Sequence, residues 1–530
     1  MNHLTKLIFG IAIFLASASL ASAWLGLIWR NSVFIFVISF GFTLLVLSKI
    51  KLPENPSKNA FLFAILTLIL AGHPFLIIHP FYDASADPAA SIVSLTIQEK
   101  IPATYAPYSN LPFTYELGFP LIAKIFIDFI PTIPAYGITW FLGLVFAFLQ
   151  AIFVYFIGKK MFDSEKAGLI GIALFSVSKI VYQNMYWGQF PFMMATVFFL
   201  SFVFFFFEQH WLAGLFFPAI FLAHPGPAAY TILFIVLAAI FFKHTRAGIL
   251  KVIPASLFAL PAFFISYKPL IENTLSSAAL TSNTANIPAY LAAIPPWVGL
   301  SFLTAVLTCV WVVKTKKYSQ EILFWITCFI SSLLLFVILG LINSGSTSLL
   351  AGRLIEFVFF SAVFVTLSVF IHIPKLQTQF FKPLVLLILF LGLILFFTST
   401  TLTHLRNGPR ITPEEAEFAF AFKTFDPYLE KALILSQSNA KIAELANKIP
   451  YNIKSKWYLP YGVHQNQSSL AYEQINEEEE TWKKIVEEQC IECINTISVR
   501  YIAVNTDFID LNMPYPLVFE FKKFKVYQKE

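Results

Sequence analysis

The sequence predicts an α-helical polytopic membrane protein of about 13 spans that ends in a small soluble α/β domain. Three observations lead to this fold class. Of the 530 residues, 58% are hydrophobic and only 12% are charged, and the mean hydropathy is +0.73. A soluble protein of this length carries about twice that charged fraction. Apolar runs recur as far as Thr400, and many approach the ~20 residues that a helix needs to cross a bilayer.

The apolar runs define the spans and the domains. Residues 1–58 form an N-terminal helical hairpin, and residues 59–400 form a transmembrane domain with a long outer loop at 80–133. The first span ends in Ala21-Ser22-Ala23, which is similar to a signal-peptidase site, but we expect an uncleaved first helix. The predicted spans are 7–28, 32–48, 59–79, 134–157, 167–180, 190–207, 211–224, 227–242, 249–267, 294–313, 321–342, 354–373 and 383–400.

The distribution of lysine and arginine predicts the orientation. Because basic residues concentrate in cytoplasmic loops, the N-terminus is predicted to be cytoplasmic and the C-terminal domain extracytoplasmic, in a plasma membrane. The net charge of +6 is spread along the loops, so no nucleic-acid partner is expected. The basic loops hold Lys6, Lys49, Lys51, Lys58, Lys159, Lys160, Lys166, Lys243, Arg246, Lys251, Lys314, Lys316, Lys317, Lys375 and Lys382. The opposite loops hold Arg30, Lys100, Lys124, Lys179, Lys268 and Arg353.

Residues 401–530 have the composition of a soluble domain. Runs of Glu and Lys replace Phe and Leu, and strands and helices alternate. Cys490 and Cys493 form a C-x-x-C without a second ligand pair, so a local disulfide or two free thiols are favoured over zinc. The predicted strands are 432–435 and 500–504, the helices are 440–448 and 477–494, and a terminal strand or hairpin covers 517–527.

The first outer loop carries the strongest chemical signal. Asp87 and Pro88 form a good helix start, and a short amphipathic helix reaching Ile101 is predicted to lie along the membrane surface. Asp83 and Asp87 stand four residues apart and are candidates for a general base and its partner. Two other interpretations stay open: Asp87 caps the helix, and Asp83 is a solvated loop acid.

The order of motifs along residues 59–373 resembles the membrane glycosyltransferases of the GT-C type, which include oligosaccharyltransferase catalytic subunits, protein mannosyltransferases and aminoarabinose transferases. The transmembrane domain is therefore expected to be GT-C-like. Two departures are visible: Ala84 directly follows the first Asp, and the metal-binding D-x-D is absent. The matching features are Asp83, the helix to Ile101-Pro102, Tyr115-Glu116-Leu117-Gly118, Tyr186-Trp187-Gly188-Gln189-Phe190-Pro191 and His224-Pro225.

The resemblance implies transfer of a sugar from a polyprenyl-phosphate donor to a protein, lipid or glycan acceptor on the outer face of the bilayer. It implies that Asp83 is the general base. Cations would stabilise the leaving phosphate, and Arg353 and Lys268 are the candidates. Arg353 has an alternative role in a pair with Glu356 or in snorkelling to the interface. No cofactor is required, and a divalent metal (Mg or Mn) is possible but not indicated.

Five further residues are candidates for substrate binding. Four of them have an alternative: a first-turn charge for Glu116, the interfacial belt for Trp187, and a satisfied buried side chain for each of the two histidines. Two other classes of function remain: a lipid or polysaccharide transporter or flippase, and a non-catalytic scaffold with an outer binding domain. Transporters usually keep acids at the bilayer midplane, whereas the predicted spans are nearly free of acids. The candidates are Glu116, Trp187, Gln189, His79 and His224.

Overall fold

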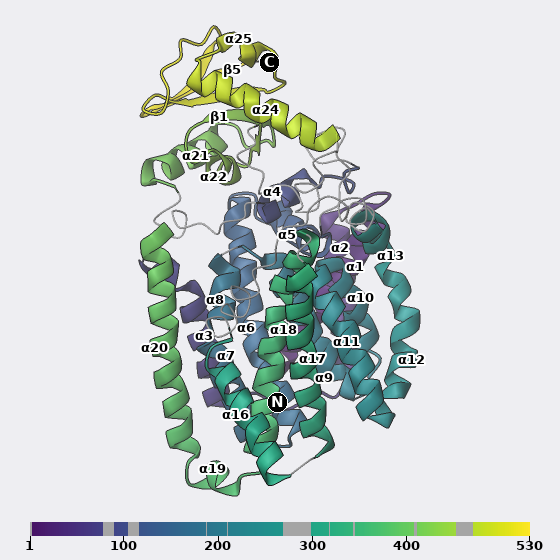
Figure 1. Ribbon diagram of the computed structural model, residues 1–530. Helices are drawn as coiled ribbons and strands as arrows, with labels where there is room; N and C mark the ends of the chain where they lie inside the picture. The colour runs from purple at the N-terminus through teal and green to yellow at the C-terminus, as the bar shows by residue number, and fades with distance from the viewer. Residues whose placement is uncertain are drawn as a thin grey trace.

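The protein is a helical bundle that carries a small α/β domain at one end (Figure 1). Among the described residues, seven helices are long and apolar enough to cross a membrane, and five shorter apolar helices accompany them. These helices and the C-terminal sheet support the coarse fold class, while the number of spans stays a prediction. The computed structural model describes residues 3–77, 89–103, 116–186, 188–208, 210–268, 298–316, 319–342, 345–407, 411–451 and 470–529.

Most helices of the bundle lie where the apolar runs predict them. The predicted span 190–207 is α9, with the same first and last residues. The helices of the bundle are α1 (His3–Gly26), α2 (Ser32–Lys49), α3 (Lys58–Ile77), α5 (Gly118–Phe129), α6 (Ala135–Met161), α7 (Glu165–Ser176), α8 (Lys179–Tyr186), α9 (Phe190–Phe207), α10 (Ala213–Ala223), α11 (Pro225–Phe241), α16 (Leu300–Thr315), α17 (Gln320–Ile342), α18 (Gly345–Phe370), α19 (Pro374–Thr378) and α20 (Phe381–Asn407).

One predicted span is irregular and another begins earlier than predicted. The span 249–267 lies in a continuous helical segment, Lys243–Ile265, that is long and apolar enough to cross a membrane. Its hydrogen bonding changes along the segment, because Pro254 and Pro261 each remove a backbone donor and crowd the preceding turn. Its pieces are η1 (Lys243–Thr245), α12 (Arg246–Ala255), η2 (Ser256–Ala259), α13 (Leu260–Ala262) and η3 (Phe263–Tyr267). The span 354–373 is α18, which begins at Gly345, so Arg353 lies inside this helix and not at its start.

Burial separates central helices from lipid-facing ones. In its most apolar window α9 is 94% buried, whereas α2 is 28% and α20 is 17% buried. Side chains such as Val37 on α2 and Leu386 on α20 are more than half exposed. A helix that is apolar all round but little buried by protein is suited to contact with lipid. The structure therefore fits a bundle whose outer helices face the bilayer.

The helix that follows Pro88 is α4 (Ala89–Thr96), which ends five residues before Ile101 and is therefore shorter than predicted. It packs against α5 and α6, and Val93 and Ser94 are both fully buried. Figure 1 shows α4 at the end of the bundle that carries the C-terminal domain. Its position along a membrane surface stays a prediction.

The C-terminal domain is an α/β sandwich around a five-stranded sheet of order β2-β1-β3-β5-β4. Strands β1, β2 and β3 are parallel, and β5 runs antiparallel to both of its neighbours, β3 and β4. One face packs on α21 and α22, and the other packs on α24 and α25. The elements are α21 (Pro413–Phe425), β1 (Lys431–Leu435), α22 (Asn439–Leu445), β2 (Ile449–Pro450), α24 (Leu470–Glu487), α25 (Ile491–Asn495), β3 (Tyr501–Asn505), β4 (Leu517–Phe521) and β5 (Phe524–Gln528).

Strands β1 and β3 confirm the two predicted strands to within one residue, and β4 and β5 confirm the terminal hairpin. Both β1 and β3 are buried along almost their whole length, because helices cover both faces of the sheet. The predicted helix 477–494 is wrong as a single helix: it consists of α24 and α25, separated at Gln489, which adopts φ +52°. Cys490 and Cys493 form a disulfide, one of the alternatives for the C-x-x-C. Disulfides persist in oxidising compartments, which agrees with the predicted extracytoplasmic position of this domain.

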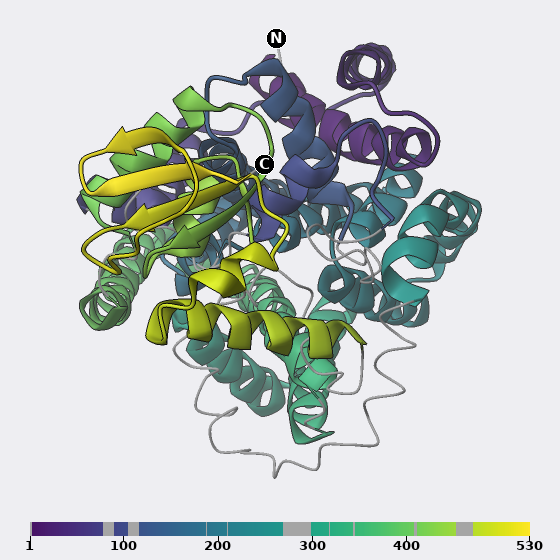
Figure 2. The same ribbon diagram turned by 90° about the horizontal axis from the view of Figure 1, so that it is seen from above.

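The C-terminal domain rests on the beginning of α6. Tyr136 of α6 belongs to the hydrophobic core beneath the sheet, and the Lys441 ammonium lies 5.5 Å from its ring centroid. Lys423 Nζ donates to the Pro131 carbonyl at 3.1 Å, and the Ala135 N–H donates to Asn447 Oδ1 at 3.3 Å. The two parts of the chain therefore share a hydrophobic core and a set of hydrogen bonds. Figure 2 shows the C-terminal domain lying over one part of the end of the bundle.

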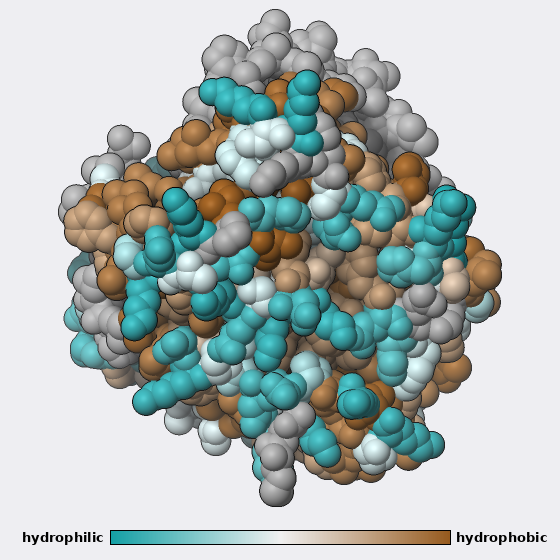
Figure 3. All heavy atoms as spheres, turned by 90° about the horizontal axis from the view of Figure 1, so that it is seen from below, coloured by the Kyte–Doolittle hydropathy of each residue, from teal (hydrophilic) through white to brown (hydrophobic). Residues whose placement is uncertain are grey.

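The opposite end of the bundle is rich in hydrophilic side chains (Figure 3). Of the basic residues that predicted the orientation, most of those that the structure describes lie near helix ends or in turns on this side and are exposed. Examples are Lys6 at the beginning of α1, Lys49 at the end of α2 and Lys382 at the beginning of α20. Which side of a membrane this end faces stays a prediction.

Candidate functional site

The structure describes part of the predicted site. Asp83, Asp87, His79 and Trp187 lie outside the described residues. The backbone of Arg353 belongs to α18, and its side chain is also outside the description. The described candidates are Glu116, Gln189, His224 and Lys268.

Glu116 and His224 are brought together although 108 positions separate them in the sequence numbering. Glu116 lies two residues before α5, and His224 forms the turn between α10 and α11. The distance from His224 Nε2 to Glu116 Oε1 is 3.8 Å. The histidine side chain is 7% exposed and the glutamate side chain is 26% exposed. A carboxylate and an imidazole thus meet at a site that solvent still reaches.

The hydrogen bonds of His224 assign its tautomer. Its Nδ1 accepts a hydrogen bond from the Gly226 N–H at 3.0 Å and so caps the beginning of α11. A nitrogen that accepts cannot carry the ring proton, so the proton is on Nε2, which faces Glu116. The pair therefore presents one N–H donor and one carboxylate acceptor.

Gly118 allows this approach. A Cβ at Gly118 would lie 2.9 Å from the Ala223 Cα and 3.0 Å from the Ala223 nitrogen, closer than real Cβ atoms come to a backbone. The absence of a side chain lets the beginning of α5 contact the α10–α11 turn directly. That contact sets the distance between Glu116 and His224.

Replacing Gly118 with alanine is expected to destabilise the protein by about 1–3 kcal/mol, because two backbone segments must separate. The measurement is thermal unfolding of the full chain in detergent. Gly41→Ala on α2 is the matched control, since a Cβ there meets nothing within 4 Å. That control should be neutral or slightly stabilising. Equal unfolding midpoints for the two variants would contradict this explanation of the contact.

A second polar cluster lies deeper in the bundle, around Glu356 of α18. Its side chain is buried, accepts from the Asn184 amide of α8, and accepts from Thr196 Oγ1 of α9 at 3.3 Å. Tyr230 of α11 places its hydroxyl 3.4 Å from Thr196 Oγ1 and stacks on Phe357 at a centroid distance of 4.8 Å. Four helices therefore contribute polar groups around one carboxylate inside the bundle.

The N-terminal part of α9 connects the two clusters. The ring of Phe192 meets the His224 ring edge to face at 5.0 Å, and the Phe192 carbonyl accepts from Thr196 Oγ1 at 3.0 Å. Gln189, a predicted substrate residue, is half-buried at the beginning of α9, and its N–H donates to the Asn184 carbonyl at 2.9 Å. Gly188 before it takes φ +67°, a conformation that glycine adopts readily. Through these contacts, the beginning of α9 and the turn before it lie beside His224 on one side and lead to Thr196 and Glu356 on the other.

Lys268 directly follows η3, at the end of the irregular helical segment that begins at Lys243, and it is exposed. Its neighbour Tyr267 donates to the Phe221 carbonyl of α10 at 2.8 Å and is close enough to Glu116 for an electrostatic interaction. The structure therefore places this segment beside the Glu116–His224 pair, with Tyr267 facing the pair more directly than the sequence led us to expect.

Sequence reasoning missed Glu356 as a site residue and considered it only as a partner of Arg353. An acid within an apolar helix was the available signal, because such groups mark functional sites in membrane proteins. Among the described residues, no group of three or more His, Cys, Asp and Glu side chains is arranged to hold a metal ion.

A charged network also joins the N-terminal hairpin to α5. Asp128 lies 2.8 Å from Lys124 Nζ and 3.2 Å from Arg30 Nη2, and it accepts from the Ser32 hydroxyl. Arg30 is nearly fully buried and also donates to the Gln98 carbonyl at 3.1 Å. Sequence reasoning used Arg30 and Lys124 only as markers of orientation.

The network makes stability depend on pH. Burial alone would raise the pKa of Asp128, but hydrogen bonds from Lys124 and Ser32 and the nearby positive charges lower that pKa overall. A lowered carboxyl pKa stabilises the fold above the unfolded value of about 3.9, and this contribution is lost as pH falls through the folded value.

Asp128→Asn is expected to lower the free energy of unfolding by about 2 kcal/mol at pH 7, because two cations lose their shared partner. The difference from the wild type should shrink below about pH 4. Thermal unfolding in detergent at both pH values measures this, with exposed Asp510→Asn as the control. A pH-independent difference would show that the charge of Asp128 is not the cause.

Comparison of the sequence with protein-family models and with curated proteins finds no match. The functional interpretation therefore depends on the geometry of this site and on the motifs in the sequence.

Proposed function

We propose that the chain is an inverting glycosyltransferase that moves a sugar from a polyprenyl-phosphate donor to a protein, lipid or glycan acceptor on the outer face of the membrane. One observation carries the proposal most strongly. Glu116 and His224, each assigned to substrate binding from sequence motifs, lie 3.8 Å apart. Glu116 lies just before α5 and His224 just before α11, and the helical segment that ends in Lys268 lies beside them. Together they form a polar site at one end of an apolar bundle.

The proposed reaction is a single displacement at the anomeric carbon of the sugar. Asp83 takes the proton of the acceptor hydroxyl or amide as its oxygen or nitrogen attacks the anomeric carbon. The bond from that carbon to the phosphate oxygen breaks, and polyprenyl phosphate leaves with the electron pair. Arg353 and Lys268 stabilise the charge on the leaving phosphate. The reaction as proposed uses no cofactor.

The remaining candidates bind hydroxyl groups of the substrates. The His224 Nε2–H donates to a sugar oxygen, and the Glu116 carboxylate accepts from a hydroxyl. Gln189 and Trp187 contribute an amide and a ring at the α8–α9 turn, and His79 precedes the loop that carries Asp83. In the sequence, the loop acids Asp83 and Asp87 lie between the end of α3 and the beginning of α4, and α4 packs on α5, the helix that Glu116 precedes.

The test is transfer of labelled sugar from polyprenyl-phosphate donors by purified membranes that contain the full chain. The proposal expects a labelled acceptor and free polyprenyl phosphate as products. Membranes without the protein are the control. Failure to release polyprenyl phosphate from every donor tested would remove the support for an enzyme and favour a protein that moves its ligand unchanged.

One observation favours a transporter or flippase as the second candidate. Glu356 is a buried carboxylate in a membrane helix, and acids at such positions commonly mark transport paths. The fate of the sugar–phosphate bond separates the two functions. A flippase reconstituted in vesicles delivers the intact lipid-linked sugar to the other leaflet, whereas the transferase breaks that bond.

A further inference from the structure

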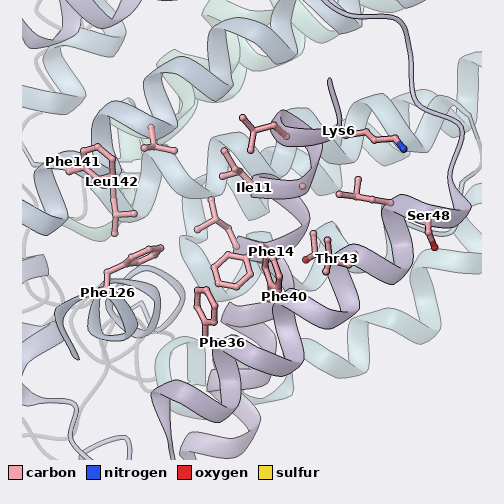
Figure 4. Close-up of a pocket in the computed structure, with 16 residues that line it drawn as sticks. Lys6, Ile11, Phe14, Phe36, Phe40, Thr43, Ser48, Phe126, Phe141 and Leu142 are labelled. Carbon is pink, nitrogen blue, oxygen red and sulfur yellow. The ribbon is translucent and has the colours of Figure 1, made fainter. Parts of the chain in front are cut away.

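A long apolar groove lies on the N-terminal side of the bundle, away from the site described above. It has a volume of about 700 Å³ and runs between α1, α2 and α6, with Phe126 contributed by α5 (Figure 4). The lining residues on α1 are Lys6, Leu7, Gly10, Ile11, Phe14 and Leu15. Those on α2 are Phe36, Phe40, Thr43, Leu44, Leu47 and Ser48, and those on α6 are Phe141, Leu142 and Val145.

Polar groups occur only toward one end of the lining. The hydroxyls of Thr43 and Ser48 donate to carbonyls of their own helix, at 2.8 Å and 2.7 Å. Lys6 is therefore the charged group that the lining offers to a ligand, and it is exposed. Figure 4 shows Lys6 at one end of the groove and Phe126 at the other. A ligand that fits has a long apolar part and a polar end beside Lys6.

The length of the groove matches one leaflet of a bilayer. Along α1 the lining extends from Lys6 to Leu15, which at about 1.5 Å per residue is about 14 Å. The hydrocarbon core of a bilayer is about 30 Å thick, so one leaflet is about 15 Å deep. Lipid reaches the groove from the side, because Leu44 is 53% exposed and Phe40 is 48% exposed.

The charge around the polar end selects an anionic headgroup. Lys49 and Lys51, at the end of α2, are exposed beside the turn that follows Ser48, and Lys6 begins the neighbouring helix. The nearest acid of that connection, Glu54, lies 3.8 Å from Lys159 Nζ. Each lysine near a bilayer surface contributes about 1 kcal/mol to the attraction of anionic lipid.

We propose that this groove binds an anionic phospholipid of the leaflet that Lys6 faces, with its acyl chains along Phe14, Phe36 and Phe40 and its phosphate beside Lys6. This lipid is separate from the donor and acceptor of the proposed transfer reaction. Its binding does not depend on that reaction being correct. The ligand fixes the N-terminal hairpin against α6 by filling the space between them.

Native mass spectrometry of the delipidated full chain in detergent tests the proposal, with phosphatidylglycerol and phosphatidylcholine of identical chains as probes. Phosphatidylglycerol is expected to bind at least about fivefold more tightly than phosphatidylcholine. Lys6→Gln is expected to lower the affinity for phosphatidylglycerol about fivefold. Lys243→Gln, an exposed lysine that does not line the groove, is the charge control.

A steric variant tests the groove itself. Leu44→Trp places a larger ring in the groove and should abolish retention of both lipids. Leu45→Trp is the control, because Leu45 is 54% exposed on the same helix but does not line the groove. Equal binding of the two lipids, or equal effects of the two tryptophan variants, would overturn the proposal. A dimer that Leu44→Trp dissociates would also overturn it, in favour of a second copy of the chain in the groove.

Discussion

Asp83→Asn is expected to lower sugar transfer at least about a hundredfold at matched expression, while the amount of folded protein in the membrane stays unchanged. Asparagine keeps the size and hydrogen-bonding shape of the side chain but cannot accept the proton of the acceptor group. The loss should appear in kcat more than in KM, because the missing interaction belongs to the transition state.

Two further variants make this result specific. Asp163→Asn is the control. Asp163 lies in the turn between α6 and α7 and takes φ +44°, a conformation that asparagine accepts well. Sugar transfer by this variant should therefore equal that of the wild type. Asp87→Asn removes the charge of Asp87 but keeps a side chain that can cap a helix, the alternative role that the sequence leaves open for this residue. If Asp83→Asn keeps full activity and Asp87→Asn loses it, Asp87 is the base. If both keep full activity, the general base does not lie in this loop.

Helices whose ends are marked by strong local signals could be predicted well from the sequence. The run 190–207 is bounded by Gly188-Gln189 on one side and Glu208 on the other, and α9 has the same limits. The beginning of α18 could not be read in this way, because Ser, Thr and Gly at 344–348 are typical of turns in water. The helix α18 nevertheless begins at Gly345, and α18 packs along α17, a contact between helices that local sequence preferences do not include.

The candidate site was predictable as a set of residue types but not as a geometry. The turn at His224-Pro225 and the motif at Glu116-Leu117-Gly118 were both recognised as local patterns. That they meet depends on Gly118 packing against Ala223, a contact between distant segments that no local rule supplies. The same is true of Arg30 and Asp128, which are distant in sequence and joined only when the hairpin docks on α5.

Lys448→Met is expected to destabilise the C-terminal domain by about 3–5 kcal/mol, because it breaks a buried ion pair and leaves the other partner uncompensated. The Lys448 side chain is fully buried, and its Nζ lies 3.0 Å from Asp426 Oδ2. The same ammonium donates to the carbonyls of Asp426 at 2.7 Å and Tyr428 at 2.6 Å. It also lies 5.2 Å from the ring centroid of Phe422. The variant therefore leaves two carbonyls without this donor and removes the cation beside the Asp426 carboxylate, which keeps only neutral donors such as the Tyr428 N–H at 3.1 Å.

The readout is hydrogen exchange of the β1 and β3 amides, followed by mass spectrometry on the full chain in detergent. A loss of about 3 kcal/mol corresponds to exchange more than about a hundredfold faster at pH 7. Lys484→Met, an exposed lysine of α24, is the matched control and should change exchange little. Unchanged protection in Lys448→Met would show that packing around the sheet, and not this ion pair, holds the domain together.

The effect of Lys448→Met should also depend on pH. Burial alone would raise the pKa of Asp426, but its hydrogen bond with Lys448 and the lysine charge contribute to lowering it. The stabilisation is therefore present above the unfolded carboxyl pKa of about 3.9 and is lost as pH falls through the lower folded value. As pH falls from about 4 toward the lower folded pKa of Asp426, the unfolded chain takes up the proton before the folded one, so the difference between wild type and variant should narrow. A difference that stays constant down to pH 3 would assign the loss to the carbonyl hydrogen bonds of Lys448 and to its ring contact, which do not require an ionised Asp426.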